Sequence, residues 1–215
     1  EGVLRLMRGC GLMALTNWTM VPFSNEIYQN LTRLALAHPE ARPRILFFDL
    51  ADPEKRTVED LRGILRLLAG FTEQGLHVIL GLNHKEALEV AEALGLSGAP
   101  AESAADPLRR LTALLREKTG IAEIVTHPRE RAAAAAREGV WSAEGPFTPS
   151  PKLSTGAGDH FNGGYCYGRL LGLEPRLALV VGKATSGFYV RNGIGPTARD
   201  MDLFLTQWAE EKLRD

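Results

Sequence analysis

Short apolar runs alternate with amphipathic stretches along residues 12–125, and this alternation constrains the fold more than any other feature of the sequence. The runs have the length of buried strands, whereas the stretches between them repeat apolar residues at helical spacing. The expected strands are residues 12–16, 45–50, 78–82 and 121–125. Strands separated by helices favour a mostly parallel sheet with helices against its faces. We therefore expect an α/β fold.

Cap residues and apolar stripes mark the helices between these strands. A helix is expected over residues 25–37, and the next carries a stripe from Val58 to Leu68 behind a capping box of Thr57 and Asp60. Gly95 is expected to end the helix after the third strand. Asp106 and Pro107 suit the cap and first position of a further helix.

The last 85 or so residues read differently. Residues 132–136 are five alanines, a good helix-forming stretch, and residues 140–152 are rich in Pro and Ser, which indicates a short strand or hairpin followed by a loop. Three helices are expected to close the chain, with Thr197 capping the last. They are residues 157–171, 176–191 and 198–213.

Composition narrows the classes of protein. With 215 residues, 45% of them hydrophobic, the chain can bury one substantial core, so a single α/β domain over residues 1–215 is expected. A formal charge of −1 gives no bulk attraction to nucleic acid or to anionic membranes. Cys10 and Cys166 lack the spacing of a zinc site or disulfide framework, and no apolar run reaches the roughly 18 residues of a membrane span. A cytoplasmic protein without nucleic-acid or membrane partners is expected.

Residues 151–164, PKLSTGAGDHFNGG, carry the strongest chemical signal. Gly156 and Gly158 allow a ligand to approach the backbone closely, and the following helix presents unpaired N–H groups at the positive end of its dipole. A phosphoryl group suits such a site. Asp159 beside it can accept the proton of an attacking hydroxyl.

These residues allow other interpretations. A lone GxGD is commonly a tight turn with the aspartate capping a helix. Gly182 and Lys183 do not form a Walker A loop, because Leu177 and Ala184 stand where that motif needs Gly and Ser or Thr. GAGDHF is not a dinucleotide fingerprint, since Phe161 replaces its third glycine.

The stretch STGAGD, followed by Phe161, Asn162, Gly163 and Gly164, resembles the second signature of the ribokinase-like, or PfkB, carbohydrate kinases. The resemblance implies a ribokinase-like fold and transfer of a phosphoryl group from ATP to a sugar hydroxyl. It implies Asp159 as general base and the backbone of Gly156, Ala157 and Gly158 as an anion hole. Its partners would be ATP with Mg²⁺ and a sugar acceptor.

Asn83 and Glu86, at the end of the third expected strand, match the NxxE motif of the same family, which lies near the phosphates and holds magnesium through water. Mg²⁺ keeps much of its hydration shell and needs few carboxylate ligands. Away from the family context, NxxE is usually a helix cap with a solvated glutamate.

The resemblance also suggests nucleotide contacts, although this chain departs from the family there. Residues 126–129, THPR, replace a glycine-containing turn, and His127 could be a neighbour of the nucleotide or a surface histidine. Lys183 aligns with an Asn that faces adenine, and residues 192–197 correspond to the loop beside the adenine. Leu153 replaces an acidic residue associated with a monovalent cation, which argues against potassium activation. The nucleotide-contact candidates are Thr126, Thr155, Lys183 and Asn192, besides Asn83 and Glu86.

The resemblance matches only the later part of a family member. The portion that carries the lid sheet, the first strands and most sugar contacts is expected to be missing, and Asn17 is the one candidate for the sugar pocket. The competing hypotheses are a non-catalytic nucleotide- or sugar-binding module, an inactive fragment, and a kinase acting on a vitamin-like ring alcohol. Those last relatives tend to alter GAGD, so the intact motif favours a sugar. Homodimerisation stays open.

Overall fold

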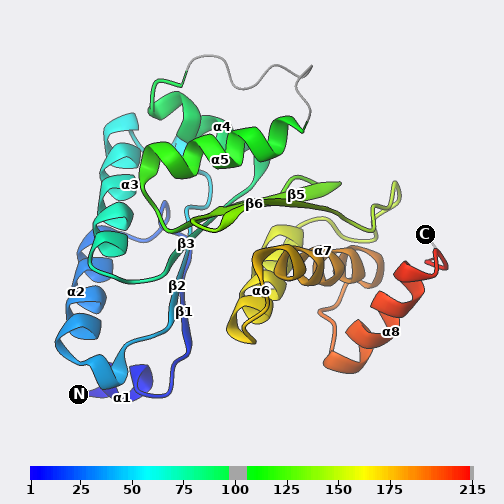
Figure 1. Cartoon of the computed structure of the whole chain (residues 1–215), viewed down its shortest axis with the longest axis horizontal. Helices are drawn as coiled ribbons and strands as arrows, with labels where there is room; N and C mark the ends of the chain where they lie inside the picture. The colour runs from blue at the N-terminus through cyan, green and yellow to red at the C-terminus, as the bar shows by residue number, and fades with distance from the viewer. Residues whose placement is uncertain (97–105, 214–215) are drawn as a thin grey trace. The chain divides into compact units, whose positions relative to one another are not determined.

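The computed structural model describes residues 1–96 and 106–213 (Figure 1). Contacts divide the chain into two compact units. The N-terminal unit comprises Glu1–Thr126 and Ala135–Val140, and the C-terminal unit comprises His127–Ala134 and Trp141–Asp215. The single domain expected over residues 1–215 stays a prediction. Among the described helices, none is both long and apolar enough to cross a bilayer.

The strands follow one another across the sheet in the order in which they occur in the chain, β1-β2-β3-β4-β5-β6. The first four are parallel, with Leu12 opposite Ile45, Leu46 opposite Val78 and Ile79 opposite Glu123. All four strands expected from the apolar runs are present, and the expected α/β fold is confirmed. Their bounds are Leu12–Leu15 for β1, Ile45–Asp49 for β2, Val78–Leu82 for β3 and Glu123–Thr126 for β4.

The connections between these strands are helical, as the sequence predicts. Thr57 and Asp60 form the expected capping box, with the Asp60 N–H donating to Thr57 Oγ1 over 3.1 Å. Asp106 accepts from the Arg109 N–H, and Gly95 follows the end of α4 at a φ of +71°. The helices are α1 Gly2–Met7, α2 Ser24–Ala37, α3 Val58–Glu73, α4 His84–Ala93 and α5 Pro107–Thr119, with short 3₁₀ turns at Pro39–Ala41 and Pro53–Lys55.

The core of the N-terminal unit lies between these helices and the parallel strands. All five residues of β3 are buried, as a strand covered on both faces should be. From the predicted stripe of α3, Leu61, Ile64 and Leu68 are buried, whereas Val58 in the first turn is 53% exposed. The rigid ends of β2 and β3 carry the polar residues described below.

The alanine run is a strand and not a helix. Arg131–Ala136 forms β5, and Gly139–Glu144 forms β6 after the two-residue connection of Arg137 and Glu138. Two residues suffice to join antiparallel neighbours. The alanines from 132 to 136 are buried, so packing overrides a helix preference that amounts to only a few tenths of a kcal/mol per residue.

Three helices make up most of the C-terminal unit: α6 Ala157–Leu170, α7 Pro175–Asn192 and α8 Ala198–Ala209. They match the prediction, except that α8 ends four residues early. α6 and α7 lie side by side (Figure 1). Their backbones are so close that a Cβ added to Gly164 would lie 3.0 Å from the Gly182 Cα. This packing fixes the start of α6, where the GAGD segment lies.

Candidate active site

The GAGD segment forms the N-terminus of α6. Gly156 is the N-cap residue at a φ of +86°, a backbone conformation that favours glycine. The Ala157 N–H donates to Ser154 O, whereas the N–H groups of Gly158 and Asp159 meet no acceptor among residues 1–96 and 106–213. The Asp159 side chain is exposed in the first helical turn. Free backbone donors and a carboxylate are therefore adjacent, as the sequence predicts.

Side chains hold three consecutive carbonyl groups of this loop. Tyr189 Oη donates to Thr155 O over 2.8 Å, and Ser186 Oγ donates to Ala157 O over 2.9 Å. His160 Nδ1 lies 2.9 Å from Gly156 O. The rings of His160 and Tyr189 stack with centroids 3.6 Å apart.

These three side chains carry no motif of their own in the sequence. Ser186 and Tyr189 are three residues apart and thus share a face of α7. That spacing was the only available signal, and it does not say which loop the face meets.

His127 also lies against this loop. Its ring stacks on Phe161 with centroids 4.6 Å apart, and a Cβ on Gly158 would lie 3.4 Å from its Cε1. Burial, followed by the charge of Lys183, lowers the pKa of His127 to about 4. Its buried Nε2 has no hydrogen-bond partner in the described part of the chain. His127 is half-buried, and its ring packs against Phe161 and the GAGD loop.

Two of the predicted nucleotide contacts have structural partners. The Lys183 side chain is buried and its Nζ donates to Arg129 O over 2.6 Å and to Pro128 O over 3.0 Å. Thr126 is fully buried, with its hydroxyl 2.5 Å from that of Thr112. The polar atoms of both side chains are engaged in hydrogen bonds within the protein. These contacts do not support the prediction that Lys183 and Thr126 bind the nucleotide.

Three further candidates lie on the surface. Thr155 and Asn192 are exposed, and Asn192 Nδ2 donates to Phe188 O within α7. Asn17, the sugar-pocket candidate, is exposed at the end of β1 with a φ of 66°. These three roles stay predictions.

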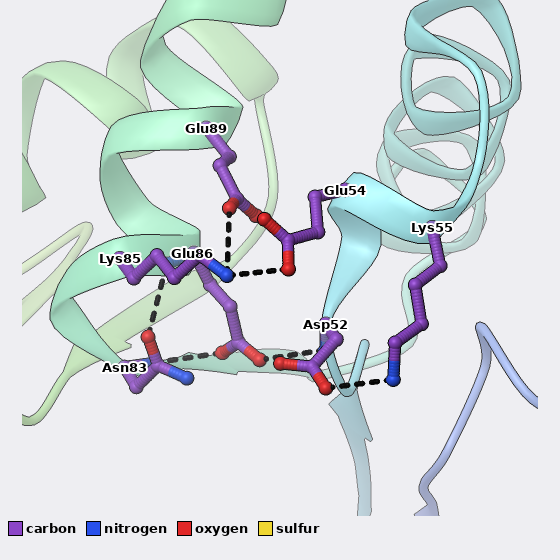
Figure 2. A network of polar contacts seen from close by, with 7 residues as sticks. All are labelled: Asp52, Glu54, Lys55, Asn83, Lys85, Glu86 and Glu89. Atoms are coloured by element: carbon purple, nitrogen blue, oxygen red, sulfur yellow. Dashed lines mark hydrogen bonds and ion pairs between the residues drawn. The ribbon is translucent and has the colours of Figure 1, made fainter.

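In the N-terminal unit, Asn83 and Glu86 form a capping box at the start of α4 (Figure 2). The Glu86 N–H donates to Asn83 Oδ1 over 3.0 Å, and Glu86 Oε2 accepts from the Asn83 N–H over 2.8 Å. Glu86 Oε1 accepts from the Asp52 N–H over 3.2 Å. Glu86 is only 5% exposed, so it is not the solvated glutamate that a bare NxxE usually supplies.

The surroundings of Glu86 carry an excess of negative charge. Burial, first of all, together with the charges of Asp49 and Asp52, raises the pKa of Glu86 to about 7, although the hydrogen bonds from the Asn83 and Asp52 N–H groups lower it. Nearby, Lys55 pairs with Asp52 at 3.0 Å, and Lys85 pairs with Glu54 at 2.6 Å (Figure 2). The sequence predicted a role for Glu86 but not for Asp49, the last residue of β2, or for Asp52, which follows that strand.

This arrangement suits a hydrated cation better than a fully protein-coordinated one. Within residues 1–96 and 106–213, no three His, Cys, Asp or Glu side chains are grouped as metal ligands. Mg²⁺ is usually held by one or two carboxylates together with water and phosphate. The buried, charge-crowded Glu86 carboxylate fits that requirement, because a nearby cation would stabilise its ionised form.

Comparison with known proteins decides the family. The family model for prokaryotic ketohexokinase matches residues 2–208. The chain belongs to the prokaryotic ketohexokinase family. The resemblance of the GAGD segment to ribokinase-like carbohydrate kinases is therefore confirmed, and the family is narrowed to the prokaryotic ketohexokinases.

Relatives of this ketohexokinase family member are distant but span nearly all of it. A ketohexokinase from Haloferax volcanii is 24% identical over 210 residues, which cover 98% of this chain and 54% of the relative. The chain thus spans about half the length of this curated relative.

Solved structures confirm the ribokinase-like fold. A ribokinase from Thermotoga maritima is 17% identical with a TM-score of 0.65, over 94% of this chain and 59% of that protein. An adenosine kinase from Sinorhizobium meliloti is 17% identical with a TM-score of 0.69, over 95% and 56%. A ribokinase II of E. coli, 16% identical with a TM-score of 0.65 over 95% and 61%, was solved in complex with ATP and Mg²⁺.

Proposed function

We propose that the protein to which this chain belongs transfers the γ-phosphoryl group of ATP to a hydroxyl of a ketohexose. The family and the name of the Haloferax relative supply the substrate class. The observation that carries the proposal is the start of α6, where the exposed Asp159 carboxylate adjoins the N–H groups of Gly158 and Asp159, which have no acceptor in the described part of the chain. A site for anionic charge and a proton acceptor are the two groups that this reaction needs from the protein.

The backbone N–H groups would stabilise the charge on the transferring phosphoryl group. They sit at the positive end of the α6 dipole and need no rearrangement during the reaction. Because the Ala157 N–H already donates to Ser154 O, we assign this role to Gly158 and Asp159 and, through its position in the same loop, to Gly156.

Asp159 would act as the general base. As the sugar oxygen forms its bond to phosphorus and the bond to ADP breaks, the hydroxyl proton passes to the Asp159 carboxylate. A carboxylate is a weak base, so its efficiency depends on the substrate hydroxyl being held within hydrogen-bond distance. Exposure of the Asp159 side chain leaves it accessible to a sugar.

Glu86 would hold the cation that accompanies ATP. When bound, Mg²⁺ neutralises phosphate charge. The buried Glu86 carboxylate would engage its hydration shell. Asn83 would position that carboxylate, because the Asn83 N–H donates to Glu86 Oε2. The E. coli structural neighbour that was solved with ATP and Mg²⁺ supports this cofactor pair.

The deciding experiment measures ATP-dependent phosphorylation of a panel of ketohexoses, aldohexoses and ring alcohols by the full-length protein and by its Asp159→Asn variant. Loss of the base should lower kcat by about 10²- to 10⁴-fold while ATP affinity changes little. Asp202→Asn, on α8, is the matched control and should keep wild-type kcat.

Each outcome has a definite meaning. The proposal is supported if wild type and Asp202→Asn phosphorylate a ketohexose and Asp159→Asn does not. If a ring alcohol is phosphorylated and no ketohexose is, the substrate class is a ring alcohol. ATP binding without turnover of any acceptor would point to a binding module. Equal kcat in Asp159→Asn and wild type would remove Asp159 from the mechanism.

A further inference from the structure

The loop before α6 is held from one side by hydroxyl groups of α7. Tyr189 Oη donates to Thr155 O over 2.8 Å, and Ser186 Oγ donates to Ala157 O over 2.9 Å. Both donors belong to the same face of α7, and both acceptors belong to the GAGD segment or the residue before it. These are specific, directional contacts between a rigid helix and the loop assigned to the phosphoryl group.

Fixing a carbonyl group also fixes the next N–H group. A peptide bond is planar and trans, so the C=O of one residue and the N–H of the following residue point in opposite directions. The bond from Ser186 to Ala157 O therefore directs the Gly158 N–H away from α7. By the same geometry, the bond from Tyr189 to Thr155 O directs the Gly156 N–H away from α7.

The two hydroxyl groups bind the peptide groups that carry the Gly156 and Gly158 N–H, which are assigned to the transferring phosphoryl group. The Gly158 N–H meets no acceptor within the described chain, so its direction is not fixed by a bond of its own. Gly156 accommodates the close approach of Tyr189, since a Cβ there would lie 3.1 Å from the Tyr189 Oη. The His160 ring, stacked on Tyr189 at 3.6 Å, holds the tyrosine ring in place.

We propose that Ser186 and Tyr189 are positioning residues for phosphoryl transfer: they hold the Ala157 and Thr155 carbonyl groups toward α7, so that the loop N–H groups face the transferring phosphate. This inference rests on the proposed function and deepens it. Neither hydroxyl touches the substrate. Each acts through a peptide plane, so its removal should loosen the donor geometry without removing a donor.

The loss should appear in the transition state more than in the ground state. Preorganised donors contribute most where charge develops, and small misplacements of such groups lower rates strongly. Removing one hydroxyl should therefore lower kcat by about tenfold, equivalent to about 1.4 kcal/mol, and leave KM for the sugar within about twofold.

The test uses Tyr189→Phe and Ser186→Ala in the full-length protein, each of which removes one hydroxyl group. Tyr167→Phe is the control, because Tyr167 is a 54% exposed tyrosine of α6. Ser186→Thr restores a hydroxyl and should recover most of the lost kcat. Thermal unfolding of each variant checks that the fold is intact.

A second readout separates positioning from simple structural support. Affinity is measured for MgADP alone and for MgADP with nitrate, a planar anion that mimics the transferring phosphoryl group. Both variants should lose nitrate-dependent affinity in proportion to their loss of kcat, and they should bind MgADP as wild type does.

The outcomes distinguish this inference from the function beneath it. If the wild-type protein phosphorylates no ketohexose, the proposed function fails and this inference fails with it. If wild type is active but both variants keep wild-type kcat and nitrate affinity, the positioning role alone is overturned. Equal losses of MgADP and nitrate affinity, or lower thermal stability with unchanged kcat, would show only a structural role.

Discussion

Lys183 carries a positive charge in a place that water scarcely reaches. Its side chain is 5% exposed, and its Nζ is bonded to the carbonyl groups of Pro128 and Arg129. Burial lowers the pKa of Lys183 to about 8, against the attraction of Glu130. Because residues 128 and 129 follow His127, which packs behind GAGD, Lys183 fixes a segment next to the candidate site.

The lowered pKa of Lys183 predicts a pH-dependent stability. Between pH 8 and 10.5 the unfolded lysine still binds its proton while the folded one has lost it, so the free energy of unfolding rises with pH in this window. A shift of that size corresponds to about 3 kcal/mol at most. Denaturant unfolding of wild type and Lys183→Met, compared at pH 7.5 and 10, should show wild type gaining stability relative to the variant. A pH-independent difference would contradict the prediction.

At the residue scale, the sequence predicted the position of GAGD at a helix start, but it did not predict side-chain contacts. The position of GAGD was predictable because it depends on the local backbone, whereas the chemical roles of Asp159 and the glycines stay predictions. The contacts of Lys183 and Thr126 depend on tertiary packing. Lys183, for example, donates to a carbonyl group more than 50 residues away in the sequence, that of Pro128. Ser186 and Tyr189 were missed for the same reason.

At the scale of elements, α6 and α7 approach through glycines. A Cβ added to Gly164 would lie 3.0 Å from the Gly182 Cα and closer still to the Thr185 side chain, and one added to Gly168 would lie 3.0 Å from the Ala178 Cα. Backbones can approach this closely only where side chains are absent. The neighbouring Gly163 is exposed, and a Cβ there would meet nothing within 4 Å.

Two adjacent glycines should therefore respond in opposite directions to alanine. Gly164→Ala should lower the free energy of unfolding by about 1–3 kcal/mol, because the added methyl forces the helices apart. Gly163→Ala should raise it by about 0.5–1 kcal/mol, because alanine has the higher helix propensity and meets no obstacle. Chemical denaturation of both variants measures the pair. Similar effects of the same sign would mean that α6 and α7 do not pack as described.

Elements with clear local signals were predictable, whereas the strand β5 was not. The Thr57–Asp60 capping box and the Asp106 cap placed α3 and α5 from local signals alone. The run 132–136 was misread because the helix preference of alanine is weak, and burial of these side chains in the folded protein outweighs it.

For the whole molecule, the alternation of strands and helices predicted the parallel part of the sheet, because consecutive strands tend to be spatial neighbours. Family membership then rests on a match over residues 2–208, although the chain covers only 54% of the Haloferax relative. Within the N-terminal unit Glu86 is buried, and within the C-terminal unit the N–H groups of Gly158 and Asp159 meet no acceptor among the described residues.

Ligand binding should raise the free energy of unfolding of the protein. At a concentration of about 100 times its Kd, ATP with Mg²⁺ should stabilise the fold by about 2.7 kcal/mol, which raises Tm by about 5–10 °C for a domain of this size. Chelating Mg²⁺ should remove part of this rise in Tm.

Glu86→Gln should lose the Mg²⁺-dependent part of the rise, because the substitution removes the buried carboxylate. Glu89→Gln is the matched control and should keep it; Glu89 lies about one turn further along α4 and pairs with Lys85 at 3.7 Å. Calorimetry of the three proteins with ATP, with and without chelator, provides the measurement. If Glu86→Gln responds to Mg²⁺ as Glu89→Gln does, the cation is held elsewhere, and the buried Glu86 carboxylate serves only to cap α4.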